Sequence, residues 1–427
     1  MGNAVNRAEV RELISKVGDG LSERKDDLIK GDLAAGSTIN SALGNHAAHV
    51  HMMKDVSGSE KYIGDREGIC AKDESVALVL PFNVTLGCCG VIAAQMLLGN
   101  TLRVRSSVIA EKSYKILESI WTKHFPGKVI FDFGPGKKFM TDMIQDPKVK
   151  LVGAYGVDTM AMQYKDMIQQ YGQTYFFEGP GKNPAIVLDD ADPVAVARQL
   201  FDLRFMRNSG QMCISPGRFY IHESIFERFT STLVELIKEH VVVGDPLDPK
   251  TTIGPLGSES GVAMIAEQVA DAVAKGAKVL HGGKIAGKIV PPTVVVNVNH
   301  QMKGMHEESF GPICWLMPYK TTDEVIKLAK DSKYGLAATV WGGKDAEKVK
   351  NALKGGDLIH KVDDFIFGEF GMVEINPNIN DPGFAERMEY GPMGGYGLSG
   401  WVWRTEGGKF NLYQGPKSFA LEASVKV

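Results

Sequence analysis

The stretch "VALVLPFNVTLGCCGVIAAQMLLGNTLRVR", Val76 to Arg105, decides the fold class. Its first part, 76–99, is long enough to cross a bilayer, but Pro81, Asn83 and neighbouring loop-forming residues interrupt the middle. The pattern instead predicts a buried strand over 76–80, a loop, a buried helix over about 87–98 and a second strand over 101–105. A strand, a helix and a strand in this order are typical of a parallel sheet.

The same alternation continues on both sides of this stretch. Helical spacing recurs in "RAEVRELISKVGDGLSERKDDLIKGDL", "EKSYKILESIWTKHF" and "KKFMTDMIQD", and strand-like runs in "KVIFDFG" and "VKLVGAYG". The second half repeats the rhythm with the strand "NPAIVLDDAD" and the helices "SIFERFTSTLVELIKEHVVV", "GVAMIAEQVADAVAKGA" and "TTDEVIKLAKDS". The predicted fold class is α/β, with parallel sheets covered by helices and nucleotide sites beyond the carboxyl ends of the strands.

Composition limits the classes of partner and the compartment. A length of 427 residues suggests two or three domains, and 44% hydrophobic with 23% charged residues is typical of a soluble globular protein. A net charge of −3 provides no basic field, so we expect no nucleic-acid partner and no membrane association. The five cysteines show no metal-type spacing, which argues against a disulfide framework and favours a reducing, cytoplasmic location.

One cysteine stands in a distinctive context. "RFMRNSGQMCISPGRFYIH", Arg204 to His222, places Cys213 in a polar, glycine-containing segment between a helix-like and a strand-like run. A cysteine there can be a buried apolar residue, a metal ligand or a nucleophile, since the thiolate is the most nucleophilic side chain near neutral pH. We expect the other four cysteines to be buried structural residues: Cys70, Cys88, Cys89 and Cys314.

Six motifs in fixed order narrow the choice. They are "FFEGPGKNPAIVLDDAD", "NSGQMC", "VGDPLDPKTTIGPL", "HEESFGP", "YGLAATVW" and "GPMGGYGLSG". Together they resemble the aldehyde dehydrogenase superfamily of NAD(P)-dependent oxidoreductases, from about residue 6 to the end of the chain. The resemblance implies a Rossmann-type parallel-sheet cofactor domain, an α/β catalytic domain and a C-terminal oligomerisation arm.

The resemblance assigns three catalytic roles. Cys213 would attack the aldehyde carbonyl and carry the thiohemiacetal and then the thioester. Asn83 of "LPFN" would supply an oxyanion-hole amide together with the backbone N–H of the cysteine. Glu178 of "FEGPGK" would activate the hydrolytic water, although Gly179-Pro180 departs from the family's usual Leu-Gly. A helix-capping Asn83 and a surface Glu178 in a turn are the structural alternatives.

The cofactor roles follow from three further segments. Glu308 would bind the nicotinamide ribose hydroxyls, and Phe310 would pack near the nicotinamide. At the adenosine end, "NTLRVRSSV" has no carboxylate where the family often has one, so Arg105, Ser106 and Ser107 could bind a 2′-phosphate. This favours NADP slightly over NAD.

Glycines near the pyrophosphate complete the cofactor set. Gly134 and Gly136 come from "FGPGKKF", and Gly156 comes from "VGAYGV". Other positions of these two loops depart from the family pattern, which keeps open a catalytically weak dinucleotide-binding or scaffold homologue.

The domain expectations are a cofactor domain over 1–180, a catalytic domain over 181–410 and an oligomerisation arm over 411–427. The chain looks like an N-terminally shortened member with a compressed oligomerisation segment at about 60–75. A homodimer or homotetramer is expected. His46, His49 and His51 form no metal-ligand cluster with other residues of the sequence, so no metal site is expected.

The predicted function is NAD(P)-dependent oxidation of an aldehyde to a carboxylic acid. Transfer of the acyl group to coenzyme A is the alternative within the enzymes, and the presence of Glu178 argues against it. Hydrolysis of esters by Cys213 without a cofactor is a third possibility. The sequence does not identify the aldehyde.

Overall fold

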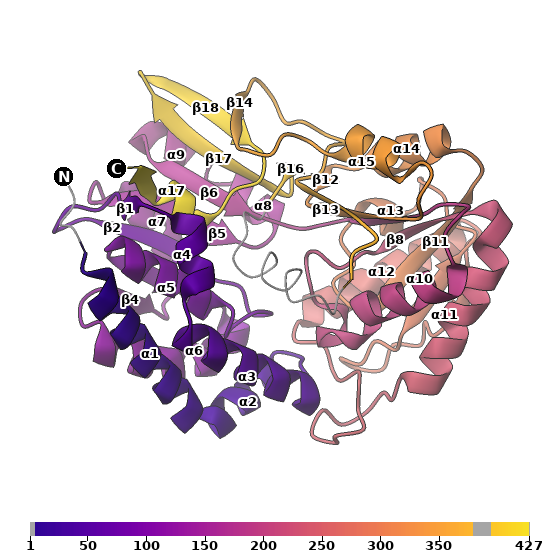
Figure 1. The fold of residues 1–427 in the computed structure, drawn as a ribbon, viewed down its shortest axis with the longest axis horizontal. Coiled ribbons are helices and arrows are strands. Elements are labelled where there is room, and N and C mark those ends of the chain that lie inside the picture. Colours follow the sequence, from indigo (N-terminus) through magenta and orange to yellow (C-terminus); the bar gives the residue numbers. More distant parts are fainter. Residues whose placement is uncertain (1–4, 379–393, 427) are drawn as a thin grey trace.

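The chain forms two large sheets that lie side by side, each covered by helices (Figure 1). The computed structural model describes residues 5–378 and 394–426, so the first three residues of "GPMGGYGLSG" lie outside the described part. Within these ranges, no helix is both long and apolar enough to cross a membrane.

The first sheet has a parallel core of five strands in the order β6-β5-β2-β3-β4. The strand order reverses direction between β2 and β5, which is the switch point where sheets of this kind bind ligands. The bounds confirm four strands expected from the apolar runs of the first half: β2 (Ser75–Val79), β3 (Leu102–Arg105), β4 (Val129–Asp132) and β5 (Val149–Tyr155). The fifth, β6 (Thr174–Glu178), was not among the expected strands.

Helices cover both faces of this sheet because its strands are apolar on both sides. Val76 and Leu78 of β2 join a core to which these helices, among others, contribute: α1 (Arg7–Glu23), α2 (Lys25–Ala34), α3 (Ile39–Lys54), α5 (Cys88–Leu98) and α6 (Glu111–His124). Ala77 faces the opposite core, to which α7 (Gly136–Gln145), α8 (Asp158–Met162) and α9 (Lys165–Tyr171) contribute. The expected α/β fold is confirmed.

The C-terminal part of the chain returns to the first sheet. β17 (Gly400–Glu406) pairs antiparallel with β6, and β18 (Lys409–Gln414) and β14 (His360–Val362) extend the sheet further. Residues 400–410, which the sequence places in the catalytic domain, therefore belong to the sheet that carries β2 to β6. Because these paired strands are so distant in sequence, no local pattern could have predicted their pairing.

The last residues also pack within the chain. After β18, the short helix α17 (Phe419–Glu422) contacts α5, and β19 (Ser424–Lys426) pairs antiparallel with β1 (Arg66–Gly68), which follows α4 (Ser57–Ile63). The segment expected to be an oligomerisation arm thus contributes to the fold of its own chain. The homodimer or homotetramer stays a prediction.

The second sheet has seven strands in the order β15-β13-β7-β8-β11-β10-β9. All neighbours are parallel except β9 and β10. Its strands are β7 (Pro184–Val187), β8 (Arg218–His222), β9 (Lys278–His281), β10 (Thr293–Val296), β11 (Ile313–Tyr319), β13 (Ala337–Trp341) and β15 (Met372–Ile375).

Helices also cover both faces of the second sheet. One face packs on α10 (Pro193–Phe201) and α11 (Phe226–His240). The other face packs on α12 (Glu259–Ala274), α13 (Lys303–His306), α14 (Thr322–Lys330) and α15 (Ala346–Leu353). A two-residue pair, β12 (Tyr334–Gly335) with β16 (Tyr396–Gly397), links this region to the strands that return to the first sheet.

Candidate active site

A cavity of about 750 Å³ extends from the carboxyl ends of the strands of the first sheet to residues 208–215 before β8. These residues carry Cys213, the predicted nucleophile, and are called the nucleophile segment below. Of the predicted site residues, seven line it: Asn83, Arg105, Gly156, Glu178, Cys213, Glu308 and Phe310. Ser106, Gly134 and Gly136 do not. These seven residues are spread over more than 220 positions of the sequence, and the fold brings them to one site.

The segment before Cys213 has an unusual backbone. Asn208 and Ser209 have φ values of 45° and 51°, in the left-handed region that side chains other than glycine rarely adopt, and Gly210 follows at 74°. Asn208 Nδ2 donates to Asn83 O at 3.1 Å, and Gln211 Nε2 donates to Gly36 O at 3.2 Å. These bonds hold the strained turn in place and fix the approach of the chain to the cysteine.

Asn183 holds the other side of the cysteine. Its Nδ2 donates to Cys213 O at 2.7 Å and to Ser215 O at 3.2 Å, and its Oδ1 accepts from Ala337 N at 3.1 Å. The side chain is buried, and it comes from the turn between β6 and β7. One amide therefore ties the nucleophile segment to the strands of the second sheet.

The thiol of Cys213 lies in an environment that disfavours its charged form. Burial raises its pKa well above the usual range, and the nearby carboxyl groups of Glu178 and Glu308 raise it further. The backbone N–H groups of Cys213 and Ile214 act in the opposite direction. A positive charge brought into the cavity would stabilise the thiolate against both carboxylates.

Glu178 ends β6 and points into the same cavity. Its carboxyl is buried, and burial raises its pKa to about 7, while the ammonium of Lys417 lowers it. A carboxyl group with a pKa near neutrality is suited to accept a proton from water at physiological pH. Glu178 is therefore a buried titratable group in the cavity and not the surface glutamate of the alternative reading.

Asn83 follows β2 in the loop before α5. Its Nδ2 donates to Gln211 O at 3.1 Å, which orients the amide toward the nucleophile segment. No hydrogen bond to a helix N-terminus is present for its side chain within 5–378 and 394–426, so the capping alternative finds no support. The Asn83 amide comes from the loop after β2, whereas the backbone N–H of Cys213 comes from the segment before β8.

Glu308 and Phe310 follow α13 on the second sheet's side of the cavity. Glu308 Oε1 accepts from Gly181 N at 3.0 Å, and burial raises the pKa of the carboxyl to about 7. The ring of Phe310 lies edge-to-face with that of Phe82, with centroids 6.1 Å apart. Lys182 beneath this loop donates to Ser309 Oγ at 2.9 Å and helps to hold it.

Arg105 ends β3, where its guanidinium reaches the neighbouring loop after β4. Nη2 donates to Gly134 O at 3.2 Å, and Nη1 donates to Ser106 O. A Cβ built on Gly136 would lie 3.4 Å from the guanidinium carbon, so Gly136 leaves room for this side chain. Ser106 itself is buried, whereas Ser107 lines the cavity.

Two of the three N-terminal histidines have hydrogen bonds of their own. His46 Nε2 bonds to Leu21 O at 2.8 Å, and His49 Nδ1 bonds to Asn45 O at 2.6 Å. His49 lines the cavity, and burial lowers its pKa. His51 is exposed.

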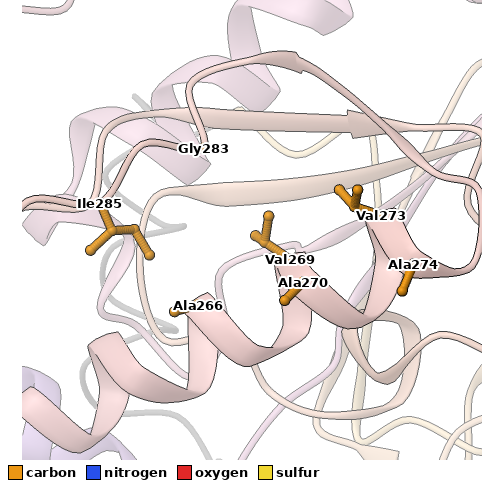
Figure 2. Close-up of a pocket in the computed structure, with 7 residues that line it drawn as sticks. All are labelled: Ala266, Val269, Ala270, Val273, Ala274, Gly283 and Ile285. Carbon is orange, nitrogen blue, oxygen red and sulfur yellow. The ribbon is translucent and has the colours of Figure 1, made fainter.

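A second hollow of about 530 Å³ lies between α12 and the loop before β10 (Figure 2). The residues that line it are aliphatic or glycine: Ala266, Val269, Ala270, Val273, Ala274, Gly283 and Ile285. It presents no group that could bind a charge or transfer a proton, so it is not a candidate active site.

Three residues that shape the site were not predicted from the sequence: Asn183, Gln211 and Lys417. Asn183 and Gln211 both belong to quoted motifs. For Gln211, its place two residues before Cys213 was a usable signal. Lys417 stands in "GPKSF" with no distinguishing pattern. Only the fold shows that it lines the cavity with Glu178.

Sequence comparison identifies relatives with this organisation. The aldehyde dehydrogenase family model matches residues 3–415. A Staphylococcus haemolyticus protein named as an aldehyde dehydrogenase is 28% identical over 413 residues, covering 92% of this chain and 82% of that protein. The succinate-semialdehyde dehydrogenase GabD of Escherichia coli, whose name specifies NADP(+), is 31% identical over 274 residues, 64% of this chain and 52% of that protein.

Solved structures share the fold. Succinate-semialdehyde dehydrogenase from Burkholderia pseudomallei has a TM-score of 0.81 at 22% identity, covering 99% of this chain and 85% of that chain. An NAD-dependent aldehyde dehydrogenase from Sinorhizobium meliloti has a TM-score of 0.80 at 24% identity, covering 99% and 81%. The chain belongs to the aldehyde dehydrogenase family, whose members are NAD(P)-dependent oxidoreductases that act on the aldehyde group.

Proposed function

We propose that this enzyme oxidises an aldehyde to a carboxylic acid through a thioester on Cys213, which water activated by Glu178 then hydrolyses. The observation that carries the proposal is the single cavity lined by Cys213, Glu178 and Glu308. A nucleophile, a base with a pKa near 7 and a carboxylate for sugar hydroxyls are the groups that this reaction requires.

The first step is addition of the Cys213 thiolate to the aldehyde carbon. The C=O π bond breaks, and the oxygen takes the electron pair. The oxyanion would lie between the Asn83 amide and the backbone N–H of Cys213. Because these donors are fixed by Asn208, Gln211 and Asn183, they need little reorganisation as charge develops.

The residues around the cavity fit a dinucleotide. Glu308 keeps one carboxylate oxygen for the ribose hydroxyls while the other accepts from Gly181, and Phe310 provides an apolar wall beside them. A bound NAD(P) supplies a hydride acceptor and a positive charge close to the thiol. "RSSV" places no carboxylate after Arg105 to repel a 2′-phosphate, and the carboxylate opposite Arg105 on β4, Asp132, accepts from Gly134 N at 2.7 Å, so we propose a preference for NADP.

The last step is hydrolysis of the thioester, which would remain on Cys213 once the thiohemiacetal carbon has lost a hydride to the acceptor that NAD(P) would supply. Glu178 accepts a proton from water while the water oxygen attacks the acyl carbon. The carbon–sulfur bond then breaks, which releases the carboxylic acid and returns the electron pair to Cys213. Burial favours this role because a desolvated carboxylate is a stronger base than an exposed one.

Transfer of the acyl group to coenzyme A is the competing outcome for the same thioester. It needs no base for water, whereas Glu178 lies buried in the cavity with its pKa near 7. This observation favours hydrolysis. Formation of an acyl-CoA product on addition of coenzyme A would reverse the assignment.

The proposal is tested by absorbance of the reduced nicotinamide with NAD and NADP offered separately. The aldehyde panel would include small aliphatic, aromatic and carboxylate-bearing compounds. Turnover by the unmodified enzyme and by Cys70→Ala, with none by Cys213→Ala, is the expected result. Cys70 is a matched control because it does not line the cavity. Equal turnover by Cys213→Ala would refute the nucleophile assignment.

A dinucleotide titration separates the remaining alternatives. If the folded protein binds neither NAD nor NADP, the result would favour the alternative of a non-catalytic scaffold protein. Hydrolysis of an activated ester without cofactor would show that Cys213 is nucleophilic, but it would not by itself distinguish the dehydrogenase from a hydrolase.

A further inference from the structure

Lys417 is a buried cation without a hydrogen-bond partner among the described residues. It follows β18 and precedes α17, and it is 1% exposed. No acceptor bonds to its Nζ within the described residues 5–378 and 394–426. Burying an ammonium without compensation is costly, so its place in the fold calls for a nearby negative charge or a functional role.

The register of β6 and β17 locates this ammonium. Glu178 on β6 pairs directly with Gly400 on β17 in the antiparallel ladder. Directly opposed residues project side chains to the same face, with Cβ atoms about 5 Å apart. A Cβ built on Gly400 would lie 2.3 Å from Lys417 Nζ. The ammonium therefore occupies the space that a side chain at position 400 would fill, on the face to which Glu178 points.

The ring of Phe176 gives an independent placement. Lys417 Nζ lies 5.6 Å from the centroid of this ring. Phe176 is two residues before Glu178 on β6, so the two side chains share one face of the strand. Lys417 also lines the same cavity as Glu178 and Cys213. The strand register, the ring contact and the cavity lining thus all place Lys417 near Glu178.

In the part of the chain that the structure describes, few titratable groups face Glu178 and Lys417. Glu178 faces Lys417, Cys213 and the hydroxyl of Tyr155. Lys417 faces Glu178 and, toward α17, Glu422. Glu422 is in turn paired with Arg404 and lies near Arg66, so its charge is already compensated.

Each charge of the pair opposes the effect of burial on the other. Burial lowers the pKa of Lys417 to about 8, and the carboxylate of Glu178 raises it. Burial raises the pKa of Glu178 to about 7, and Lys417 limits that rise. Each group therefore favours the charged form of the other.

We propose that Lys417 is a positioning residue for thioester hydrolysis, whose ammonium keeps the Glu178 carboxylate ionised and directed into the cavity. The inference rests on the proposed role of Glu178 as the base. It adds a lysine from the C-terminal segment to the hydrolytic apparatus. It also explains why position 400 is glycine, because any side chain there would displace the ammonium.

The test is the pH profile of thioester hydrolysis in Lys417→Met. After a single turnover, loss of the acyl group from the protein is followed by mass spectrometry. An opposite charge nearby lowers the pKa of a carboxyl by roughly one unit or more. Removal of the ammonium should therefore move the acidic limb of the profile, the pH range in which the rate rises with pH, to higher pH by that amount. Below the limb, hydrolysis should slow about tenfold for each pH unit by which the limb moves. Formation of the reduced nicotinamide should change much less.

Three further variants complete the experiment. Lys417→Arg should restore the limb, and Lys409→Met, an exposed lysine on β18, should leave it unchanged. Gly400→Ala should mimic Lys417→Met, since its methyl group takes the place of the ammonium. It also provides the test if Lys417→Met does not fold.

An acidic limb that stays in place in folded Lys417→Met or Gly400→Ala would overturn the inference. Failure of the underlying function looks different. If Glu178→Gln hydrolyses the thioester at the normal rate, the assignment of the base is wrong. If Glu178→Gln blocks hydrolysis and Lys417→Met leaves the limb in place, only the role of Lys417 is wrong.

Discussion

The side-chain amide of Asn183 donates a hydrogen bond to the backbone oxygen of Cys213 at 2.7 Å. Asn183 belongs to the turn between β6 and β7, so it connects the strand that carries Glu178 with the segment that carries the nucleophile. The same amide accepts from Ala337 N on β13. This buried side chain therefore helps to fix the position of Cys213 relative to Glu178.

Asn183→Ala should reduce both stability and activity. The change leaves two buried carbonyl oxygens and one buried N–H without their partner, and each orphaned group costs about 1–3 kcal/mol. We expect a loss of roughly 3 kcal/mol or more in the free energy of unfolding, measured by urea denaturation. The exposed Asn40→Ala, which removes a single bond to Pro249 O, is the control and should cost much less. Equal losses in the two variants would contradict the central place given to Asn183.

The pKa of Glu178 predicts the pH dependence of hydrolysis. Since burial raises this pKa to about 7, the base form disappears as the pH falls through about 7. The rate of thioester hydrolysis should therefore rise with pH up to about 7 and then level, with a tenfold change per pH unit on the acidic side. Stopped-flow and quench measurements of acyl-enzyme decay would check this. A limb near pH 4 would show that the carboxyl is solvated.

Arg105→Ala should weaken NADP binding more than NAD binding. A charge-assisted hydrogen bond to a phosphate contributes about 1.5–3 kcal/mol, so the Kd for NADP should rise roughly tenfold or more. Arg103→Ala, two residues earlier on β3 and paired with Asp146 outside the cavity, is the control. Titration of both variants with each dinucleotide gives the comparison. Equal weakening of NAD and NADP would remove the argument for an NADP preference.

The strands and helices were predictable because the signal is local. The apolar runs at 76–80 and 101–105 and the glycine-led helix between them match β2, α5 and β3 closely. Cys213, Glu178 and Asn83 could be singled out as candidate site residues because each stands in a motif of fixed spacing. All three line the cavity.

The parts that were not predicted depend on contacts between distant segments. β17 joins β6 across more than 220 residues of sequence, and neither strand carries a mark of its partner. Lys417 becomes relevant only through that pairing, because it lies against Gly400 opposite Glu178. Ser106 and Ser107 were both considered for the 2′-phosphate from the sequence, whereas the fold buries Ser106 and leaves only Ser107 of the two lining the cavity.

The most direct test of the proposed mechanism is to trap the thioester in Glu178→Gln. An aldehyde that the unmodified enzyme turns over would be supplied with the preferred dinucleotide, followed by intact-mass and peptide mass spectrometry. The mechanism predicts one equivalent of reduced nicotinamide and a stable acyl adduct on Cys213, both absent from Cys213→Ala. Steady turnover by Glu178→Gln with no adduct, or an adduct on a residue other than Cys213, would contradict it.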